Sequence, residues 1–407
     1  MSEFRPILAT LLRHKMAASL IVLEIALSCA IICNAVFLIG QRIERIDMPS
    51  GIAENELVNV QITGIGRDEN AQAMTATDLS ALQAIPGVKA VAVANQVPFN
   101  NSSWNNSVSL TPDQERPTLN ATMYLGSPGL LDALGARIMQ GRMFAADDYV
   151  QLDPALGFAG IDVSSVVITR AMAERLFPGK SALGQAIYMG DDKPVHIIGI
   201  IERLVRPNLS NGVGNEDAMI LPLRVPYTMG GHYLIRTTPD QRERVLDEAV
   251  AALEKNASNR IVLNRRTMEQ MRLDYFRQDR SMVWLLVAVC VALLVVTALG
   301  IVGLASFWVQ QRTKQIGVRR ALGATRGQIL RYFQTENFLL ATVGIVLGML
   351  MAYGINQLLM GKYELPRLPL HYLPIGAVAL WVLGQLAVLG PARRAAAVPP
   401  AVATRSV

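Results

Sequence analysis

Four long apolar runs constrain this sequence more than any other feature. They cover residues 17–40, 282–309, 338–360 and 372–390. A helix needs about 20 apolar residues to cross the hydrocarbon core of a bilayer, so each run predicts a transmembrane helix. Residues 41–281, between the first and second runs, are polar enough for a soluble domain. We therefore expect an α+β membrane protein with four transmembrane helices and a large α+β domain outside the membrane.

The loop between the second and third runs, residues 310–337, is rich in basic residues. It contains Arg312, Lys314, Arg319, Arg320, Arg326 and Arg331. Short loops with many Lys and Arg residues stay on the cytoplasmic side of a membrane. This orientation places the large domain and the short loop 361–371 outside, and both chain ends, including the basic tail 391–407, in the cytoplasm. Topology thus explains the net charge of +6, and we expect no nucleic-acid partner.

Residues 1–16 are predicted to form an amphipathic helix on the cytoplasmic surface of the membrane. Its apolar side chains follow helical spacing: Phe4, Ile7, Leu8, Leu11 and Leu12. A cleaved signal peptide is the alternative. The apolar run that follows is too long for one, and no small-x-small cleavage site comes after it, so a retained membrane anchor is favoured.

The exterior domain has the pattern of two similar halves. Strands are predicted at 57–62 and 88–93 in the first half and at 232–237 and 260–263 in the second, and each pair flanks a predicted helix. Two such βαβ halves can share one ferredoxin-like sheet. The segment between them, about 100–227, has several short strands and many Pro and Gly turns, and it is predicted to form a separate mixed subdomain.

Two helices are predicted to continue out of the membrane and to pair as a coiled-coil stalk. Apolar residues keep a 3-4-3 spacing beyond the first run, and a similar spacing leads without a break into the second run. The stalk residues are Ile39, Ile43, Ile46, Met268, Met271 and Tyr275. A rigid stalk suits mechanical coupling, although ordinary helix packing gives the same pattern.

Glycines in the spans predict places where helices approach closely. They are Gly300 and Gly303 in the second span and Gly344 and Gly348 in the third. Such contacts join either two subunits or two helices of one subunit.

Two polar features of the first span each allow two interpretations. Glu24 is either a proton or substrate relay or a polar contact with a neighbouring helix. Cys29 and Cys33, one helical turn apart, are either a metal pair or packing residues. Packing is favoured for the cysteines because no His or third thiol lies nearby.

Within the basic loop, Ile316, Arg319, Arg320 and Gly323 recur at helical spacing. Gly323 predicts the end of this helix before a second helix begins at residue 324. A short helix held at the membrane surface can pass force from a soluble partner to the spans.

The loop segment RTKQIGVRRALGATRGQIL resembles the cytoplasmic loop of the FtsX/MacB superfamily of ABC-transporter permeases, which is the coupling helix that docks on the ATPase subunit. The match includes Ala321, and the resemblance implies an ATPase-coupling role for Arg312, Thr313, Ile316, Gly317, Arg319, Arg320, Gly323 and Ala324. The sequence departs from the family at Gln315, where an acidic residue is usual. Contact with anionic membrane lipid is the alternative role of this loop.

Four further segments carry the same resemblance. Residues 166–189 and 195–201, VVITRAMAERLFPGKSALGQAIYM and VHIIGII, resemble the MacB-type periplasmic core domain, as does LGARIMQGRMFAADD at 134–148. The tail GPARRAAAVPPAVATR resembles the closing segment of the family. Together these segments cover nearly the whole chain.

No chemistry of its own is predicted for the chain. The sequence contains no zinc-protease motif, nucleophile elbow or phosphate loop. We therefore expect a non-catalytic transmembrane subunit with no catalytic residue, no metal site and no cofactor. ATP and Mg²⁺ are then expected to bind to a partner chain.

The resemblance implies a permease subunit in a bacterial inner membrane, with its large domain in the periplasm. Its expected partners are two copies of an ABC ATPase, a second permease copy or a related permease, and, in efflux systems, a periplasmic adaptor and an outer-membrane channel. The implied function is mechanotransmission for efflux of a small molecule or peptide. Regulation of a cell-wall hydrolase, as in FtsX-like subunits, and lipoprotein extraction are the alternatives.

Overall fold

A computed structural model describes residues 15–66, 68, 70–152, 161–190, 193–210, 212–256, 259–363 and 367–399. The chain divides into two compact units. One, the helical unit, comprises Met1–Asp47 and Gln278–Val407, and the other, the exterior domain, comprises Met48–Arg277. The predicted amphipathic helix lies outside the described residues as far as residue 14.

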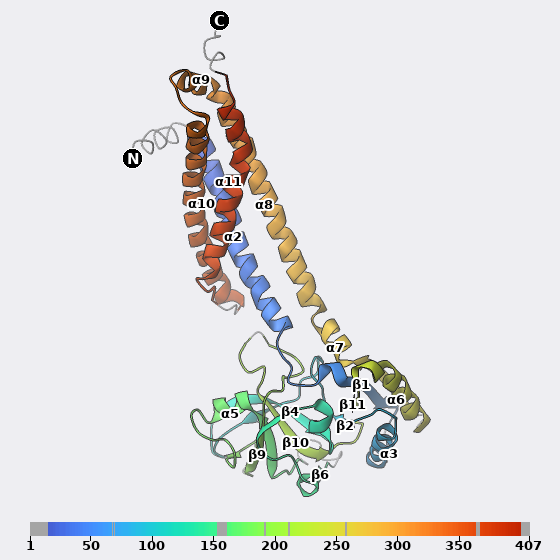
Figure 1. The fold of residues 1–407 in the computed structure, drawn as a ribbon. Helices are drawn as coiled ribbons and strands as arrows, with labels where there is room; N and C mark the ends of the chain where they lie inside the picture. The colour runs from blue at the N-terminus through green and yellow to red at the C-terminus, as the bar shows by residue number, and fades with distance from the viewer. Residues whose placement is uncertain are drawn as a thin grey trace. The chain divides into compact units, whose positions relative to one another are not determined.

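The helical unit contains the four predicted spans (Figure 1). They are α2 (Lys15–Ile46), α8 (Arg277–Gln311), α10 (Arg326–Tyr363) and α11 (Tyr372–Ala396). Each is long and apolar enough to cross a membrane, which confirms the four transmembrane helices. The helices exceed their apolar runs. α10 begins inside the predicted loop 310–337, and α11 ends inside the predicted tail, because polar residues continue both helices.

Small residues let α2 pack closely against α10 and α11. A Cβ atom on Gly344 would lie 2.9 Å from Cβ of Ile25, and one on Gly348 would lie 2.5 Å from Cβ of Cys29. On α11, a Cβ atom at Gly376 would lie 2.6 Å from Sγ of Cys33. The two cysteines therefore fill notches in neighbouring helices, in agreement with the packing interpretation.

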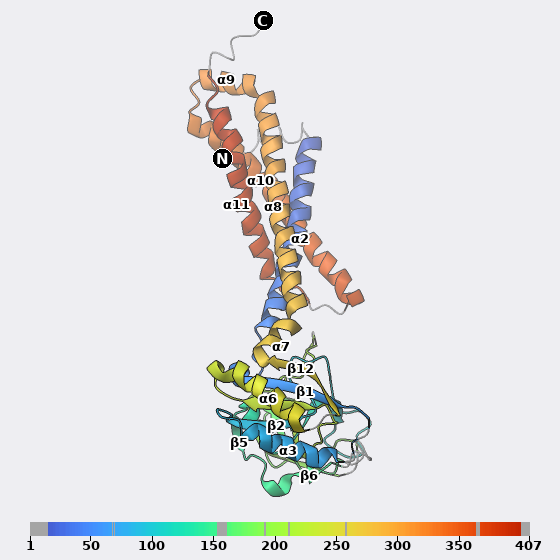
Figure 2. The ribbon, with the colours of Figure 1, turned by 90° about the vertical axis from the view of Figure 1, so that its right-hand side faces the viewer.

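Two βαβ halves form one end of the sheet in the exterior domain, as predicted. The first half is β1 (Leu57–Gly64), α3 (Ala71–Gln83) and β2 (Ala90–Ala94), and the second is β11 (His232–Arg236), α6 (Arg242–Asn256) and β12 (Arg260–Thr267). The strand order is β12-β1-β11-β2, with all neighbours antiparallel. This is the ferredoxin-like arrangement, and α3 and α6 lie together on one face of the sheet (Figure 2).

The segment between the halves continues the same sheet, so it differs from the separate subdomain that the sequence predicts. Its elements are β3 (Asn105–Val108), β4 (Leu119–Gly126), α4 (Leu130–Leu134), β5 (Ile138–Gly141), β6 (Val150–Gln151), β7 (Ser165–Thr169), α5 (Arg170–Leu176), β8 (Ala186–Ile187), β9 (Val195–Ile201) and β10 (Ala218–Arg224). The order continues as β2-β4-β10-β7-β9-β5. β4 joins β2 where Ala94 faces Gly126. The physical reason is that a bare β2 edge exposes unpaired backbone groups, which β4 covers.

A buried ion pair ties the ferredoxin-like elements together. Asp78 of α3 and Arg260 of β12 form a two-point ion pair with almost no exposure to solvent. Tyr233 Oη of β11 donates to Asp78 Oδ2 at 2.6 Å, and Asn256 Nδ2 of α6 donates to Oδ1 at 3.0 Å. The three residues that donate to Asp78 lie in three different elements. Because Asp78 itself lies in α3, its carboxylate connects two helices and two strands.

Replacement of Asp78 by Asn should destabilise the exterior domain by about 3–5 kcal/mol, because Arg260 is left buried without a counter-charge. The matched control is Asp247→Asn, which removes an exposed partner of Arg265 and should cost less than about 1 kcal/mol. Urea unfolding of the detergent-solubilised chain, followed by hydrogen exchange in β11, measures both. Equal losses in the two variants would contradict the role given to Asp78.

His232 is a second buried polar residue of this sheet. Its Nδ1 lies 3.2 Å from Asn59 Oδ1, and its Nε2 lies 3.2 Å from Asn100 Nδ2. These contacts fit a neutral ring that donates from Nδ1 and accepts at Nε2. Burial lowers the pKa of His232 from 6.5 to about 4. The ring is therefore neutral in the folded domain at pH values where an unfolded chain would protonate it.

Stability of the exterior domain should consequently fall between pH 6.5 and pH 4. In this window the unfolded state binds a proton that folded His232 does not, so the stabilisation present above pH 6.5 is lost as the pH falls. The loss that this residue contributes is about 3 kcal/mol at pH 4. His232→Gln keeps a polar side chain but cannot titrate, and its urea midpoint should depend less on pH. Parallel pH profiles for the two proteins would rule this out.

Candidate functional site

The basic loop contains a short helix with defined ends. α9 (Thr313–Ala321) follows α8 after Arg312, whose φ of −101° and ψ of 9° interrupt the helix. Gly323 has φ of +96°, a conformation that glycine adopts without strain, and its N–H donates to Arg320 O at 3.1 Å. The predicted helix end at Gly323 is therefore confirmed.

The next helix begins with a capping box. Gln328 N donates to Thr325 Oγ1 at 3.3 Å, and Thr325 N donates to Gln328 Oε1 at 2.9 Å. These two bonds satisfy backbone donors at the start of α10 that have no partner within the helix. Figures 1 and 2 show α9 at one end of the helical unit, beside the ends of α8, α10 and α11.

The inner face of α9 is fixed by apolar packing. Ile316 and Gly317 are buried. Ile316 belongs to a small core with Val309 of α8, Ile329 and Phe333 of α10, and Ala392, Ala395 and Ala396 of α11. Arg320 Nη1 donates to the backbone oxygen of Ala396. α9 is therefore held by three other helices.

A buried ion pair fixes the corner between α8 and α9. Arg312 is 7% exposed and Glu336 of α10 is 1% exposed, and Arg312 Nη1 lies 3.0 Å from both carboxylate oxygens. The guanidinium group also lies 5.5 Å from the ring centre of Trp308. Removing one partner of such a pair leaves a buried charge, so the geometry of this corner is strongly specified.

The outer face of α9 exposes two apolar side chains among cations. Val318 is 50% exposed and Leu322, one turn further, is 83% exposed. Arg319 lies beside them, with its guanidinium carbon 4.9 Å from the ring centre of Tyr332. An i, i+4 apolar pair on an otherwise polar helix face was the sequence signal for this feature, and the predicted site set does not include either residue.

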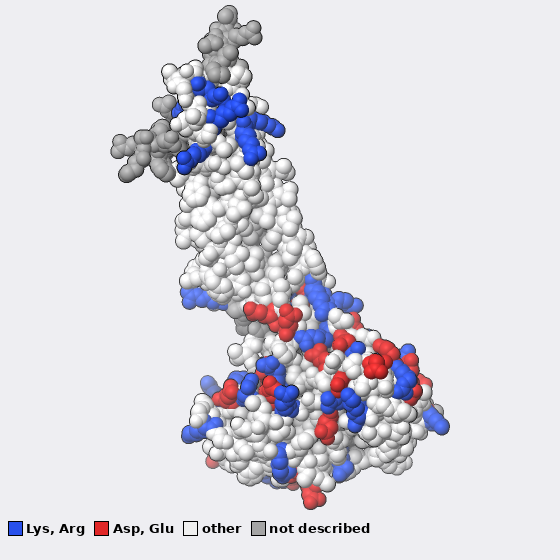
Figure 3. Space-filling view, viewed as in Figure 1, with Lys and Arg blue, Asp and Glu red and all other residues white. Residues whose placement is uncertain are grey.

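The surface around α9 is basic. The exposed residues Lys314, Arg319, Arg326, Arg331, Arg393 and Arg394 belong to it. Between residues 281 and 363 the sequence has a single acidic residue, Glu336, and it is paired with Arg312. Figure 3 shows Lys and Arg gathered at the α9 end of the helical unit, next to an uncharged band along the helices. This surface favours a negatively charged partner.

The predicted coupling residues therefore separate into two groups. Arg312, Ile316 and Gly317 are buried and build the site, as does Thr313, whose Oγ1 donates to Val309 O at 2.9 Å. The residues that a partner can reach are Arg319 and Gly323, with Arg320 and Ala324 partly exposed. The coupling role of both groups stays a prediction.

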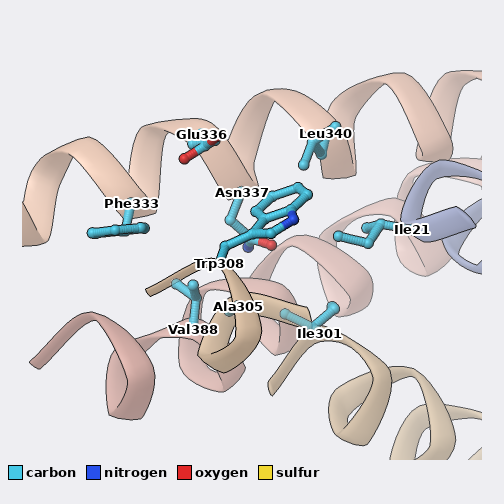
Figure 4. Close-up of a pocket in the computed structure, with 9 residues that line it drawn as sticks. All are labelled: Ile21, Ile301, Ala305, Trp308, Phe333, Glu336, Asn337, Leu340 and Val388. Atoms are coloured by element: carbon cyan, nitrogen blue, oxygen red, sulfur yellow. The ribbon is translucent and has the colours of Figure 1, made fainter. Parts of the chain in front are cut away.

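A small cavity lies beside the corner (Figure 4). Its lining includes Ile21 of α2, Trp308 of α8, Glu336 and Asn337 of α10, and Val388 of α11. The volume is about 10 Å³, against the 300 Å³ or more of a typical ligand pocket. The cavity is too small for a transported molecule, so we assign no substrate site here.

The predicted stalk residues lie in two different units. Ile39, Ile43 and Ile46 are in α2, which continues beyond its apolar run as predicted. Met268 and Met271 are buried in α7 (Met268–Tyr275) of the exterior domain. Tyr275 Oη accepts from Leu209 N at 2.7 Å and donates to Asn208 Oδ1 at 3.1 Å. A coiled-coil pairing of these residues stays a prediction.

The predicted continuous helix before the second span is wrong, because Phe276 separates α7 from α8. Phe276 is fully buried, with its ring centre 5.9 Å from that of Phe99 and 4.9 Å from that of Tyr275. Arg272 lies 5.7 Å above the same ring. Aromatic packing therefore holds the chain out of helical geometry at this one residue.

Replacement of Glu336 by Gln should loosen α9, because Arg312 loses its counter-charge in the buried corner. A cysteine at Ile316, in a chain without Cys29, Cys33 and Cys290, reports this loosening through its rate of maleimide labelling in detergent. We expect labelling to be about tenfold faster, a modest part of the cost of breaking a buried pair. Arg331→Gln, which removes an exposed charge from the same helix, is the control and should leave the rate unchanged. Equal rates in all three proteins would contradict the role of the ion pair.

Comparison with known proteins gives matches over nearly the whole chain. Residues 20–260 match the MacB-like periplasmic core domain, and residues 287–400 match the FtsX-like permease C-terminal domain. The macrolide export ATP-binding/permease protein MacB of Acinetobacter baylyi is 27% identical over 98% of this chain and 59% of its own length. The ABC transporter permease YknZ of Bacillus subtilis is 25% identical over 100% of this chain and 99% of its own.

Among solved structures, the extracellular domain of a YknZ transporter from Gram-positive bacteria covers 51% of this chain and 100% of its own, with 20% identity and a TM-score of 0.32. The chain spans about half the length of the MacB relatives that it matches, 59% in one and 50% in another. The core-domain match alone covers more than half of this chain. The chain therefore belongs to the MacB-like, FtsX-like family of ABC transporter permeases.

Proposed function

We propose that the chain is the permease subunit of a MacB-like ABC transporter and transmits conformational change from a separate ATPase to the exterior domain. ATP and Mg²⁺ then bind to this partner ATPase, which hydrolyses the nucleotide. The family membership supports an ATPase as the partner. α9 then acts as the coupling helix on which the ATPase docks.

The observation that carries this proposal is that α9 has one packed face and one exposed apolar face. Its inner face is fixed to α8, α10 and α11 through Ile316 and the Arg312–Glu336 pair. Its outer face presents Val318 and Leu322 to the surroundings. When a partner displaces α9, the helices that hold it move with it, because α9 is packed against all three of them.

Charge indicates the chemistry of the docking surface on the partner. Val318 and Leu322 fit an apolar pocket, and the surrounding arginines fit a rim of acidic side chains. Gln315 is neutral where the family usually has an acid, so the partner needs no cation at that point. The apolar pair and the cations therefore supply the contact.

α8 is the path from the coupling helix to the exterior domain. It runs as one helix from Gln311 to Arg277, and a single residue, Phe276, separates it from α7. The side chains of α7 are bound into the exterior domain through Met268, Met271 and Tyr275. Displacement of α9 therefore reaches that domain along one covalent element.

The orientation in the membrane follows from charge. The basic α9 end lies in the cytoplasm, where the ATPase is, and the exterior domain lies in the periplasm of a bacterial inner membrane. Both chain ends are cytoplasmic in this orientation. The uncharged band of Figure 3 is the part of the helical unit that lipid surrounds.

The assembly contains two permeases and two ATPases. Four spans form a small bundle. Only 17% of an 18-residue apolar stretch of α8 is buried within this chain, so α8 has a face that a second permease copy or a related permease can cover. The MacB relatives are named for macrolide export, and we propose efflux of a small molecule or peptide for this chain. A periplasmic adaptor and an outer-membrane channel complete the path.

Replacement of Val318 and Leu322 together by Asp should abolish ATPase capture, because both charges enter the apolar contact and oppose its acidic rim. Tagged permease purified from its native cells is assayed for co-purified ATP hydrolysis. We expect at least about a tenfold loss, as for loss of central interface residues. Val213→Asp, at an apolar residue of the exterior domain that is 88% exposed, is the control and should retain full capture. Undiminished hydrolysis in the double variant would refute α9 as the docking site.

A further inference from the structure

Glu24 has a defined partner surface on α8. Its carboxyl group lies against Gly300, where a Cβ atom would come within 2.7 Å of the carboxyl carbon. One turn along the same two helices, Ser28 Oγ and Thr297 Oγ1 lie 2.7 Å apart, and both side chains are buried. Gly300 therefore forms a notch that receives the Glu24 carboxyl group. We call this notch and the Ser28–Thr297 hydrogen bond the α2–α8 seam.

α8 is packed less tightly within the helical unit than α2. In α2, 56% of an 18-residue apolar stretch is buried, whereas in α8 the buried share of such a stretch is 17%. Apolar surfaces resist sliding only where side chains interlock, as Gly344 and Gly348 interlock with Ile25 and Cys29 on α2. The polar contacts between the two helices, which are those of the seam and the ion pair of Arg42 with Asp279, consequently have a large share in fixing the position of α8 along α2.

We propose that Glu24 is a positioning residue for α8. Its carboxyl group in the Gly300 notch, with the Ser28–Thr297 hydrogen bond beside it, sets the register of α8 along α2. The significance of this register rests on the proposed function, because it decides where the α9 end of α8 meets the ATPase. Of the two interpretations that the sequence leaves open, the geometry favours the contact with a neighbouring helix, since the Glu24 carboxyl group lies against Gly300 of α8.

The neighbouring glycine of α8 provides a matched control. Gly300 and Gly303 are three residues apart on the same helix, but a Cβ atom on Gly303 would have nothing within 4 Å. Alanine at either position gains the same helix propensity. Alanine at Gly300 alone displaces the Glu24 carboxyl group.

Disulfide cross-linking in native membranes measures the register directly. Ser28→Cys and Thr297→Cys, in a chain with Cys29, Cys33 and Cys290 replaced by Ala, place two thiols where the hydroxyl groups now meet. Oxidation by copper phenanthroline should join them rapidly. Gly300→Ala displaces the Glu24 carboxyl group from the notch and should slow this reaction several-fold because the register is no longer fixed, and Gly303→Ala should not. Adding Glu24→Ala to Gly300→Ala removes the clash and should return the rate to that of Glu24→Ala alone.

A second cysteine pair separates register from general loosening. Ser28→Cys with Leu293→Cys tests a position of α8 displaced by one turn. Glu24→Ala should raise cross-linking of this pair several-fold relative to the Ser28–Thr297 pair, and Glu24→Gln, which keeps the shape of the side chain, should not. A general loosening of α8 would lower the cross-linking of both cysteine pairs together.

Two results would overturn the inference: equal cross-linking of Gly300→Ala and Gly303→Ala, or an unchanged ratio of the two pairs in Glu24→Ala. Neither measurement requires an ATPase. Failure to capture an ATPase would therefore refute the proposed function while leaving the register result intact. Normal capture with an unchanged register would refute this inference alone.

Discussion

The lipid environment requires α8 to satisfy its own backbone hydrogen bonds. A bilayer offers no water to a broken helix, so a lipid-facing span remains helical along its length. α8 is accordingly unbroken over 35 residues, from Arg277 to Gln311. At 1.5 Å per residue it is about 50 Å long. The interruptions occur just beyond its two ends, at Phe276 and Arg312, where side chains of the surrounding structure hold the chain out of helical geometry.

These two interruptions set the bounds of α8 as a separate helix. At one end, Arg312 pairs with Glu336 and starts α9, whose inner face is packed and whose outer face is open. At the other, Phe276 leads into α7, which the exterior domain binds through buried methionines. Near this end, Asp279 pairs with Arg42 of α2. Specific side-chain contacts are therefore present near both ends of α8, and the proposed transmission of movement depends on them.

The repeating parts of the structure could be predicted from the sequence. Length and hydropathy identified the spans, alternating strands around two helices identified the βαβ halves, and Gly323 identified the end of α9. These features follow from local periodicity and from backbone conformations that only certain residues adopt. The apolar cysteines of α2 were also assigned correctly to packing, because no third ligand accompanies them in the sequence.

The features that were missed depend on contacts between distant residues. The spacing of apolar residues before the second span fits one continuous helix and two helices separated by Phe276 equally well. Only the packing of Phe99 against Phe276 distinguishes the two structures. Arg312 resembles a surface residue until Glu336, on another helix, is seen beside it. The segment between the two halves was predicted to be a separate subdomain because its sequence does not indicate that β4 pairs with the edge of β2. Val318 and Leu322 were overlooked because exposure is a property of the folded corner.

The most direct measurement of force transmission is hydrogen–deuterium exchange in α7 of the chain purified together with its ATPase, with and without ATP. α7 carries no part of the docking surface, so its exchange responds only if movement passes through the transmembrane helices to the exterior domain. The account predicts a reproducible change of exchange in Met268–Tyr275 when ATP is added. ATP hydrolysis by the complex with unchanged exchange in α7 would contradict it.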